Sequence, residues 1–453
     1  MSTWSRSDAS GNEPSAAGST GPGSTGAQTI EASASSERPR IPREIWVLIG
    51  AAFIIAVGFG LITPVLPQFA RSFDVGVTAA SIVVSAFAFF RLIFAPVGGR
   101  LVSALGERPV YLVGLVIVAL STGATAFAQS YGQLLLFRSL GGIGSTMFTV
   151  SSAALIIRLA PPSIRGRVSS VFASSFLLGG VVGPLVGGVL GGFGLRVPFI
   201  VYAVALLIAA GVVATFLSGA RMHELRAGTA APAMTFREAL GHSAFRSAMV
   251  SGFANGWSNF GVRLAIIPLF VAAILLGTPH ESRTAQLAGF AIATFAAGNA
   301  LALTFSGRLA DSIGRRTPVM TGLVVSGVAT LVLGFVTNIW LILGLCLIAG
   351  MGAGILNPAQ QATVADVVGN ERSGGSVLAG FQMSMDTGTI LGPVLVGVLI
   401  DSLGYREGFL TTGMVLLLAA LAWIPARETL PGRAQDGGRT AAPDDPALSR
   451  DEG

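Results

Sequence analysis

Long apolar stretches separated by short polar ones form the dominant pattern of this chain. From Trp46 onward, runs of about 20 mainly apolar residues recur, and this is the length that an α-helix needs to cross a bilayer. A polar stretch at about residues 218–245 divides these runs into six and six. We predict twelve membrane-spanning helices, at about residues 45–68, 77–98, 109–128, 132–157, 169–193, 197–217, 246–275, 285–306, 317–336, 339–362, 376–400 and 407–425.

The expected fold is therefore an all-α polytopic membrane protein with twelve transmembrane helices in two six-helix bundles. Residues 1–44 are rich in Ser, Gly, Ala, Thr and Pro, which predicts a disordered tail, and their lack of an apolar segment argues against a signal peptide. The N-terminal bundle is expected at 45–217, the central loop at 218–245, the C-terminal bundle at 246–426 and a second polar tail at 427–453.

Composition agrees with this prediction and excludes several kinds of protein. Hydrophobic residues make up 52% of the chain and charged residues 11%, against about 25% charged residues in soluble domains. The chain contains no lysine, so its 28 basic residues are all arginine. A P-loop and a retinal Schiff base both need a lysine, and we therefore expect no ATP binding. The single cysteine, Cys346, excludes an intrachain disulfide, and we expect no metal site and no other cofactor.

The distribution of the arginines predicts the orientation in the membrane. The two tails and the loops on their side contain 21 of the 28 arginines, whereas the loops on the opposite side contain four. Because positively charged loops stay in the cytoplasm, we expect both tails and the central loop to be cytoplasmic in a bacterial inner (plasma) membrane. The net charge of +6 fits contact with anionic lipid and does not indicate nucleic-acid binding.

The two halves of the chain repeat each other. GRLVSALGERPV, at 99–110, matches GRLADSIGRRTPV, at 307–319, and the Gly-Pro pair at 183–184 matches the pair at 392–393. Parallel repeats of this kind are found in transporters that bind their substrate between the halves.

The matching loops contain a glycine-rich motif with acidic and basic residues. Glycines permit tight turns at a membrane face, and the charged side chains can form ion pairs and hydrogen bonds. The copy in the first half has Ser103 where the acid is expected. The motif residues are Gly307, Asp311, Gly314, Arg315 and Arg316 in the second half and Gly99, Arg100, Gly106 and Arg108 in the first half.

Two further motifs lie within predicted helices. The fourth helix contains R-x-x-x-G-x-G, which begins at Arg138. The fifth contains G-x-x-x-G-P-x-x-G-G, formed by Gly179, Gly183, Pro184, Gly187 and Gly188. Glycine at every fourth position leaves a bare helix face on which another helix can pack closely, and proline adds a kink.

With these three motifs the chain resembles the major facilitator superfamily over about residues 45–426, and it looks most like the twelve-helix drug–proton antiporter branch. The resemblance implies two pseudo-symmetric bundles that alternate access, loop motifs that gate this change, an Arg138 tied to proton coupling, and a fifth-helix motif that favours export. From the residues alone, other roles stay open. The loop arginines would then fix only the topology, Arg138 would snorkel to the interface or pair with a neighbour, and the glycines would serve only packing.

Asp386, in FQMSMDTGTILGP, is the one carboxylate that falls well inside a predicted span. A charge at the bilayer centre costs about 2.5–3.5 kcal/mol, and such residues are functional by default. We therefore expect Asp386 to bind the coupling proton. Its counter-ion is expected among Arg91, Arg138 and Arg263, of which Arg91 lies in mid-span. The alternative is a permanent ion pair that only holds helices together.

A polar face on the seventh predicted helix is expected to line the substrate cavity. Ser251, Asn255, Asn259 and Arg263 recur at every fourth position and therefore share one face. The alternative is an interhelical seam of hydrogen bonds, each worth about 0.6 kcal/mol. Our predicted cavity residues are Asn255, Trp257, Asn259 and Arg263, with Asn357 and Gln361 from the tenth predicted helix.

These observations predict a secondary transporter that exports a small amphipathic, drug-like molecule by proton antiport. Its expected partners are the small-molecule substrate, protons and the lipid bilayer, and we expect a monomer. Three intramembrane arginines against one acid favour neutral or anionic substrates. Export of a metabolite such as a sugar, amino acid or siderophore, and proton-coupled import, are alternatives. An enzyme would need a catalytic cluster at a membrane face, which the loops lack, and a receptor would not need an internal repeat.

Overall fold

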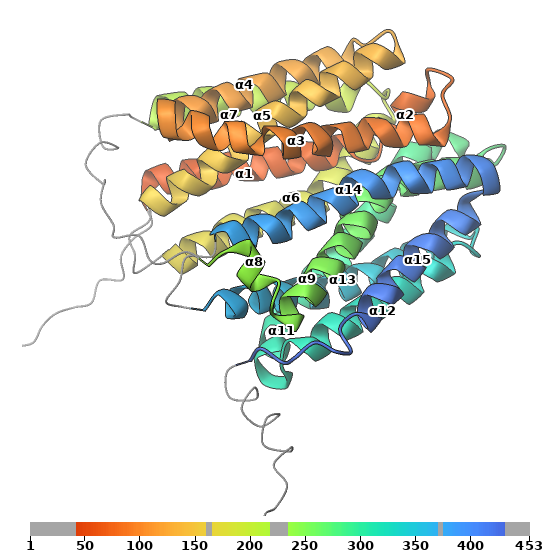
Figure 1. Ribbon diagram of the computed structural model, residues 1–453. Coiled ribbons are helices and arrows are strands. Elements are labelled where there is room, and N and C mark those ends of the chain that lie inside the picture. The colour runs from red at the N-terminus through yellow and green to blue at the C-terminus, as the bar shows by residue number, and fades with distance from the viewer. Residues whose placement is uncertain (1–41, 160–164, 218–233, 370–374, 431–453) are drawn as a thin grey trace, which may run out of the picture. The chain divides into compact units, whose positions relative to one another are not determined.

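The computed structural model describes residues 42–159, 165–217, 234–369 and 375–430, which form helices joined by short connections (Figure 1). The first half contains α1 (Arg43–Ile62), α2 (Leu66–Arg71), α3 (Val77–Leu105), α4 (Glu107–Ala126), α5 (Tyr131–Leu159), α6 (Arg165–Gly191) and α7 (Val197–Phe216). The second half contains α8 (Phe236–Ala239), α9 (Ser243–Asn255), the π-helical segment η3 (Gly256–Val262), α10 (Arg263–Leu275), η4 (Glu281–Arg283), α11 (Thr284–Ile313), α12 (Arg316–Leu333), α13 (Ile339–Val368), α14 (Gly375–Leu403) and α15 (Tyr405–Leu421).

The predicted twelve-span helical fold is confirmed. Within the described residues, eleven helical segments are long and apolar enough to cross a membrane. The twelfth predicted span corresponds to α15, which has 17 residues. The seventh span is built from three consecutive segments, α9, η3 and α10.

Several helix boundaries differ from the predicted ones. α3 continues to Leu105 and α11 to Ile313, beyond the predicted ends at 98 and 306, because hydropathy marks the bilayer, whereas helical hydrogen bonding continues into polar sequence. The first predicted span is instead divided between α1 and α2. Pro64 lies between these helices and Pro67 in the first turn of α2, and neither has a backbone N–H to continue the hydrogen bonding of α1. The predicted central loop is described only from residue 234, and that part contains α8 and the start of α9.

Glycines bring neighbouring helices into backbone contact within each half. On α6, Gly179, Gly183 and Gly187 lie against α1, and on α14, Gly388 and Gly392 lie against the seventh span. A Cβ added at any of these five positions would lie closer than van der Waals distance to the backbone of the other helix. This is the close packing that the motif spacing predicts, whereas the export role of the α6 motif stays a prediction.

The winding of the seventh span changes where it meets α14. Gly256, the first residue of the π-helical segment, lies directly against the backbone carbonyl of Met385, so that no side chain fits there. Single π-helical turns inside α-helices occur frequently at functional sites. In this protein the π-helical segment brings the seventh span against the part of α14 that contains Asp386.

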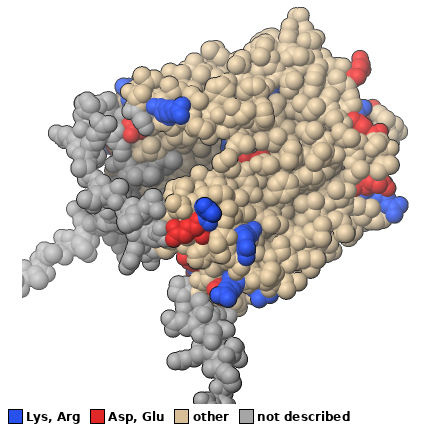
Figure 2. Space-filling model, viewed as in Figure 1, with Lys and Arg blue, Asp and Glu red and all other residues tan. Residues whose placement is uncertain are grey.

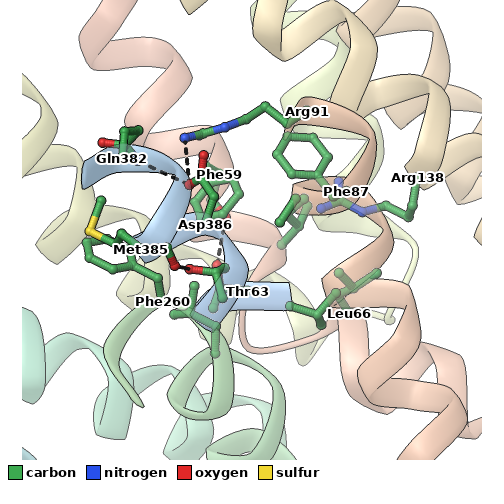
Figure 3. Close-up of a pocket in the computed structure, with 15 residues that line it drawn as sticks. Phe59, Thr63, Leu66, Phe87, Arg91, Arg138, Phe260, Gln382, Met385 and Asp386 are labelled. Carbon is green, nitrogen blue, oxygen red and sulfur yellow. Dashed lines mark hydrogen bonds and ion pairs between the residues drawn. The ribbon is translucent and has the colours of Figure 1, made fainter. Parts of the chain in front are cut away.

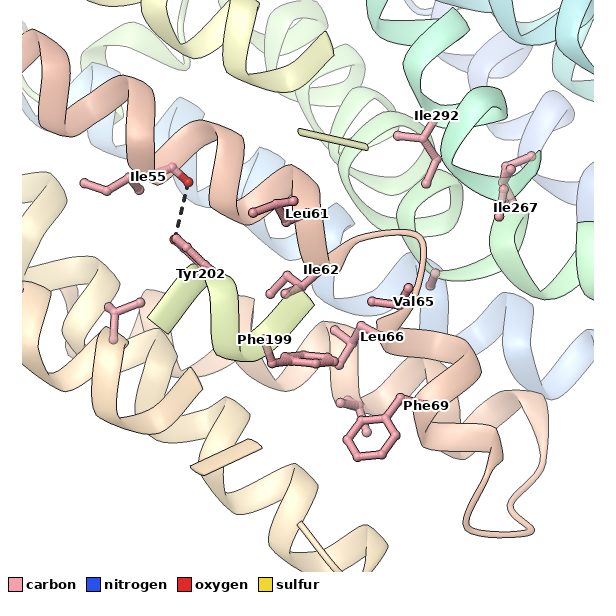
Figure 4. Packing of buried hydrophobic residues seen from close by; sticks show 14 of the residues in the cluster. Ile55, Leu61, Ile62, Val65, Leu66, Phe69, Phe199, Tyr202, Ile267 and Ile292 are labelled. Atoms are coloured by element: carbon pink, nitrogen blue, oxygen red, sulfur yellow. Dashed lines mark hydrogen bonds between the residues drawn. The ribbon is translucent and has the colours of Figure 1, made fainter. Parts of the chain in front are cut away.

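The two halves join through α3 packed on α14 and α6 packed on α11. Gly397 of α14 lies against Thr78 of α3, and Gly188 of α6 lies against Ala285 of α11. These contacts are at the end of the helices that contains α2 and the turn between α14 and α15, which we call the α2 end. A cluster of buried apolar side chains includes residues of both halves there (Figure 4), among them Leu61, Ile62, Val65, Phe69, Ile267 and Ile292.

The outer surface is apolar in a wide band. Figure 2 shows that, on the face in view, the charged side chains gather mainly toward the two ends of the helices, with few between them. Large apolar side chains such as Leu120, Leu207 and Leu418 are more than two-fifths exposed. Contiguous apolar exposure on this scale marks contact with lipid, so the protein is a multi-pass membrane protein.

Candidate functional site

A cavity lies between the two halves. Its volume is about 520 Å³, and its walls come from both halves, with Phe59, Phe87 and Phe148 on one side and Phe260 and Phe295 on the other. A smaller recess of about 160 Å³ shares Phe59, Phe87, Phe260, Arg91 and Arg138 with it and reaches α14 (Figure 3). We call the two together the central cavity. Aromatic walls with a few polar groups are typical of small-molecule sites.

An ion pair crosses the central cavity from one half to the other. An Nη2 atom of Arg91, on α3, lies 3.5 Å from Oδ1 of Asp386, on α14 (Figure 3). Gln382, one turn earlier on α14, donates a hydrogen bond from Nε2 to the same oxygen at 3.1 Å. The side chains of Arg91 and Asp386 are 36% and 15% exposed, so solvent can reach the pair. Of the three arginines considered as counter-ions, Arg91 is the one placed against Asp386.

Arg138 lies in the cavity wall on α5 with only 5% of its surface exposed. Its guanidinium stacks over the ring of Phe87 at 4.6 Å from the centroid, and its buried Nε has no hydrogen-bond partner. One turn later, Gly142 lies against the backbone carbonyl of Phe87. The R-x-x-x-G-x-G spacing thus brings α5 close enough to α3 to hold the guanidinium over this ring. This burial does not match a side chain that snorkels to the interface.

Arg263 is separate from the Arg91–Asp386 pair. It is 3% exposed, its Nη2 donates to Thr330 Oγ1 at 3.2 Å, and its guanidinium lies 4.1 Å from the centroid of the Phe295 ring. Its charge is therefore held inside the second half by a hydroxyl and an aromatic face. Cation–π contacts of this kind stabilise a buried cation more than an exposed one.

The polar face of the seventh span forms a hydrogen-bonded seam with α13. Asn259 donates to Asn255 Oδ1 at 2.6 Å, and Asn255 donates to Asn357 Oδ1 at 2.8 Å. Asn255 and Asn259 are at least 95% buried. Asn259 also lines the larger part of the central cavity. The sequence predicted that this face lines the substrate cavity and left an interhelical hydrogen-bonded seam as the alternative. The geometry of Asn255 and Asn357 matches the seam.

Two other predicted cavity residues have surroundings that the sequence did not indicate. Gln361 is exposed, and its neighbour Gln360 is the glutamine that bonds the seventh span, through Nε2 to Ser251 Oγ at 2.6 Å. Trp257 is 6% exposed and packs on Phe253 with the ring centroids 5.8 Å apart. A substrate role for either residue stays a prediction.

The second-half loop motif forms a network of charges at the end opposite α2. Arg315 pairs with Asp311, one turn earlier, and its Nε lies 3.1 Å from Oδ2 of Asp366 on α13. Burial acts to lower the pKa of Arg315, but the hydrogen bonds that its guanidinium donates to Asp311 and Asp366, and the charges of these acids, outweigh burial and raise the pKa. Gly314, at φ +98°, makes the turn that leads into α12.

Glu428, after α15, completes this network. Its carboxylate accepts hydrogen bonds from the backbone amides of Arg315, at 2.7 Å, and Arg316, at 3.2 Å, which begin α12. It also accepts bonds from the amides of Thr429 and Leu430. Burial of Glu428 acts to raise its pKa, but these amides outweigh it and hold the pKa below its usual 4.5. The gating role of Gly307, Asp311, Gly314, Arg315 and Arg316 stays a prediction.

The first-half loop matches the second in its backbone more than in its charges. Gly106, at φ +87°, has the same left-handed conformation as Gly314, which explains glycine at both positions. Arg108 donates from Nη2 to the carbonyl of Ala214 at 2.8 Å, a contact within the first half. The side chain of Ser103 lies outside the described residues, and the gating role of Gly99, Arg100, Gly106 and Arg108 stays a prediction.

Sequence reasoning missed several polar residues. Asn299 on α11 lines the central cavity with a buried Oδ1 that has no hydrogen-bond partner. Because it is an amide within an apolar run, the sequence could have indicated it as a cavity residue. Gln382 could have been found by its position one turn from Asp386. Asp401 and Glu428 lie at the ends of apolar runs, where an acid is ordinary, so their contacts could not be read from the sequence.

Comparison with known proteins decides the family. The model of the Major Facilitator Superfamily matches residues 48–282 and 248–450. The chain belongs to the Major Facilitator Superfamily. Multidrug resistance protein 2 of Bacillus subtilis is 25% identical over 384 residues, which cover 82% of this chain and 92% of that protein. The predicted resemblance to the superfamily and its drug–proton antiporter branch is confirmed.

Two further relatives of this superfamily member are named for drug resistance. The class H tetracycline resistance protein of Pasteurella multocida is 26% identical over 86% of this chain and 98% of its own length. The quinolone resistance protein NorA of Staphylococcus aureus (strain COL) is 24% identical over 79% of this chain and 90% of its own length. A bacterial homologue of the human lysosomal transporter Spinster, in an inward-facing and unoccupied conformation, has a similar structure, with a TM-score of 0.70, 17% identity, and coverage of 84% of this chain and 95% of that chain. This likeness shows the fold.

Proposed function

We propose that this protein exports a small amphipathic, drug-like molecule across a bacterial plasma membrane in exchange for protons. The substrate would enter the central cavity from the cytoplasm, and the two halves would alternate between openings to either side. The names of the relatives support export of drug-like molecules, since they refer to resistance to several unrelated drugs. The aromatic walls of the central cavity support an amphipathic substrate.

The ion pair between Arg91 and Asp386 is the observation on which the proton part of the proposal rests. Its carboxylate faces the central cavity, and its two members belong to the two halves. A proton on Asp386 would remove the attraction between α3 and α14 at this level. A substrate that donates a hydrogen bond to the ionised carboxylate would favour the form without the proton. Proton and substrate would then occupy the site by turns, as antiport requires.

Proton flux in everted membrane vesicles tests this function. Addition of each of a panel of dyes and antibiotics is expected to release protons from energised vesicles that contain the wild-type protein. The release should vanish in Asp386→Asn with substrate binding retained, and Asp386→Glu should restore part of it. Glu407→Gln, an acid of α15 outside the central cavity, is the matched control and should behave as wild type.

The outcomes separate the parts of the proposal. Equal flux in wild type and Asp386→Asn would contradict proton binding at Asp386 and leave it as a structural ion pair. Flux of the opposite sign on addition of a sugar, amino acid or siderophore would instead support proton-coupled import. No flux with any compound, in vesicles that contain folded protein, would contradict the transport proposal.

The proposed orientation has its own test. Cys346 is fully buried, so a cysteine added at an exposed position becomes the reactive one. With an impermeant maleimide on intact cells, His280→Cys, in the connection between α10 and α11, should be labelled. Ser449→Cys, in the C-terminal tail, should be labelled only after the membrane is permeabilised. The reverse pattern would contradict cytoplasmic termini.

A further inference from the structure

Asp401, near the end of α14, binds the first turn of α3 in the other half. Its Oδ1 accepts a hydrogen bond from the amide of Val77 at 2.9 Å. Its Oδ2 accepts bonds from the amide of Thr78 at 2.8 Å and from the Thr78 hydroxyl at 2.6 Å. The first amides of a helix have no partner within it and attract negative charge. Gly76, which precedes α3, has no side chain to cap them, so the cap comes from the other half of the protein.

Glycine on both sides makes this contact possible. A Cβ on Gly76 would lie 2.9 Å from Asp401 Oδ2, and a Cβ on Gly397, one turn before Asp401, would lie 2.9 Å from the Cα of Thr78. The backbones of α3 and α14 therefore approach at the α2 end without intervening side chains. The contact is specific, because it uses two oxygens, three donors and two bare positions.

The contact between α6 and α11 corresponds, by the sequence repeat, to the contact between α14 and α3. It has close-packed glycines but no acid at the position of Asp401. Gly188 lies against the backbone of Ala285, and a Cβ on Gly192 would lie 3.3 Å from Gln286 Nε2. At the α2 end, the carboxylate cap therefore distinguishes the α3–α14 contact from the α6–α11 contact.

We propose that Asp401 is a latch that holds the α2 end closed and is released when the central cavity opens toward that end, which rests on the alternating access of the proposed function. α3 and α14 are joined at two levels, by Arg91 and Asp386 in the central cavity and by Asp401 at the α2 end. A contact made in one conformation only shifts the equilibrium by the free energy it contributes there. Loss of the latch therefore favours the conformation open at the α2 end, with no change in the substrate's own contacts.

Cysteine labelling measures this shift directly. Thr63 lines the central cavity near the α2 end and is 7% exposed. In a Cys346→Ser background, Thr63→Cys reports access from that side when an impermeant maleimide is added to right-side-out vesicles. Asp401→Ala should raise the labelling rate about fivefold, the usual scale for loss of a helix cap. Asp401→Asn, which keeps one acceptor oxygen, should give a smaller increase.

A double-mutant cycle separates the latch from general destabilisation. Thr78→Val removes one donor from the other side of the contact and should also raise the rate. Combined with Asp401→Ala it should add nothing, because the two changes remove the same interaction. Glu407→Gln, an acid at the same end, should leave the rate unchanged.

Three results would overturn the latch. The first is that Thr63→Cys is labelled at the same rate with and without Asp401→Ala, while Thr63→Cys in the otherwise wild-type protein is labelled from both sides of the membrane. This result would contradict the latch but would leave alternating access intact. Another is full additivity of Asp401→Ala and Thr78→Val. The third is no labelling of Thr63→Cys from the α2 side in any variant, which would contradict alternating access as well.

Discussion

Asp386 and Asp401 lie on one helix, about four turns apart, and both contact α3. Asp386 meets the Arg91 guanidinium inside the central cavity, whereas Asp401 meets backbone amides at the α2 end. Pro393 lies between them in α14. The same pair of helices thus contains the proposed proton site and the proposed latch. A change at Asp386 can reach the α2 end along one helix, with no further element needed to connect them.

The ion pair should be visible in stability as well as in transport. Arg91→Gln and Asp386→Asn each leave one charge in the cavity without its partner, at a cost of about 1–2 kcal/mol for a partly buried pair. The double variant removes both charges and should recover most of this loss. Thermal unfolding in detergent measures it. A double variant as unstable as the sum of the two would contradict the pairing of Arg91 with Asp386.

Two glycines of α6 predict opposite effects of alanine. Gly183 lies against α1, where a Cβ would be 2.5 Å from the carbonyl of Val57, whereas Gly180 has open space around it. Gly183→Ala should push the helices apart and destabilise the fold by about 1–3 kcal/mol. Gly180→Ala should be neutral or slightly stabilising, because alanine favours a helix. Equal melting temperatures for the two variants would contradict close packing of α6 on α1.

Adjacent glutamines on α13 provide another matched pair. Gln360 is 1% exposed and bonds Ser251, whereas Gln361 is exposed. Gln360→Ala leaves the Ser251 hydroxyl without this partner in a buried site and should cost about 1–3 kcal/mol. Gln361→Ala should change the free energy of unfolding by less than about 0.5 kcal/mol. Thermal unfolding of the two variants in one detergent compares them, and a larger loss for Gln361→Ala would refute the seam.

Glu428 predicts a pH dependence at the end opposite α2. Its pKa is below 4.5 in the folded protein, so its ionised form stabilises the fold above that pH. The stabilisation is lost as pH falls through the folded pKa, because the proton then competes with the amides of Arg315 and Arg316. Protection of these two amides from hydrogen exchange should fall in the wild type as the pH drops through the lowered pKa of Glu428. Glu428→Gln should show weaker protection at neutral pH and no such transition; a transition that persists in it would assign the effect to another acid.

The spans and the repeat could be predicted because each depends on residues close together in the sequence. An apolar run of bilayer length is stable only as a helix across the membrane, whatever its neighbours are. Glycines at turn positions such as Gly106 and Gly314 were predictable for the same local reason. Asp386 could be singled out from the cost of placing a charge in that run.

Contacts between helices could not be predicted in this way. The sequence leaves Arg91, Arg138 and Arg263 as possible partners of Asp386, and the rotation and approach of α3 and α14 place Arg91 against it. The sequence predicts that the polar face of the seventh span lines the cavity, whereas the packing of α13 directs much of this face into hydrogen bonds between the two helices. Asp401 has no distinctive sequence signal, because its partner is the backbone of a helix in the other half.

By itself, then, the sequence determined that the chain crosses the membrane as two repeated sets of six helices, with a single acid in mid-span. The free energy of transfer of each apolar stretch from water to the bilayer is a sum over its own residues, so it can be read from the sequence. The tertiary structure alone decided which charges neutralise one another, which amides face a seam, and which acid caps a helix of the opposite half. Those choices depend on distances of a few ångströms between segments that are hundreds of residues apart, and packing sets them.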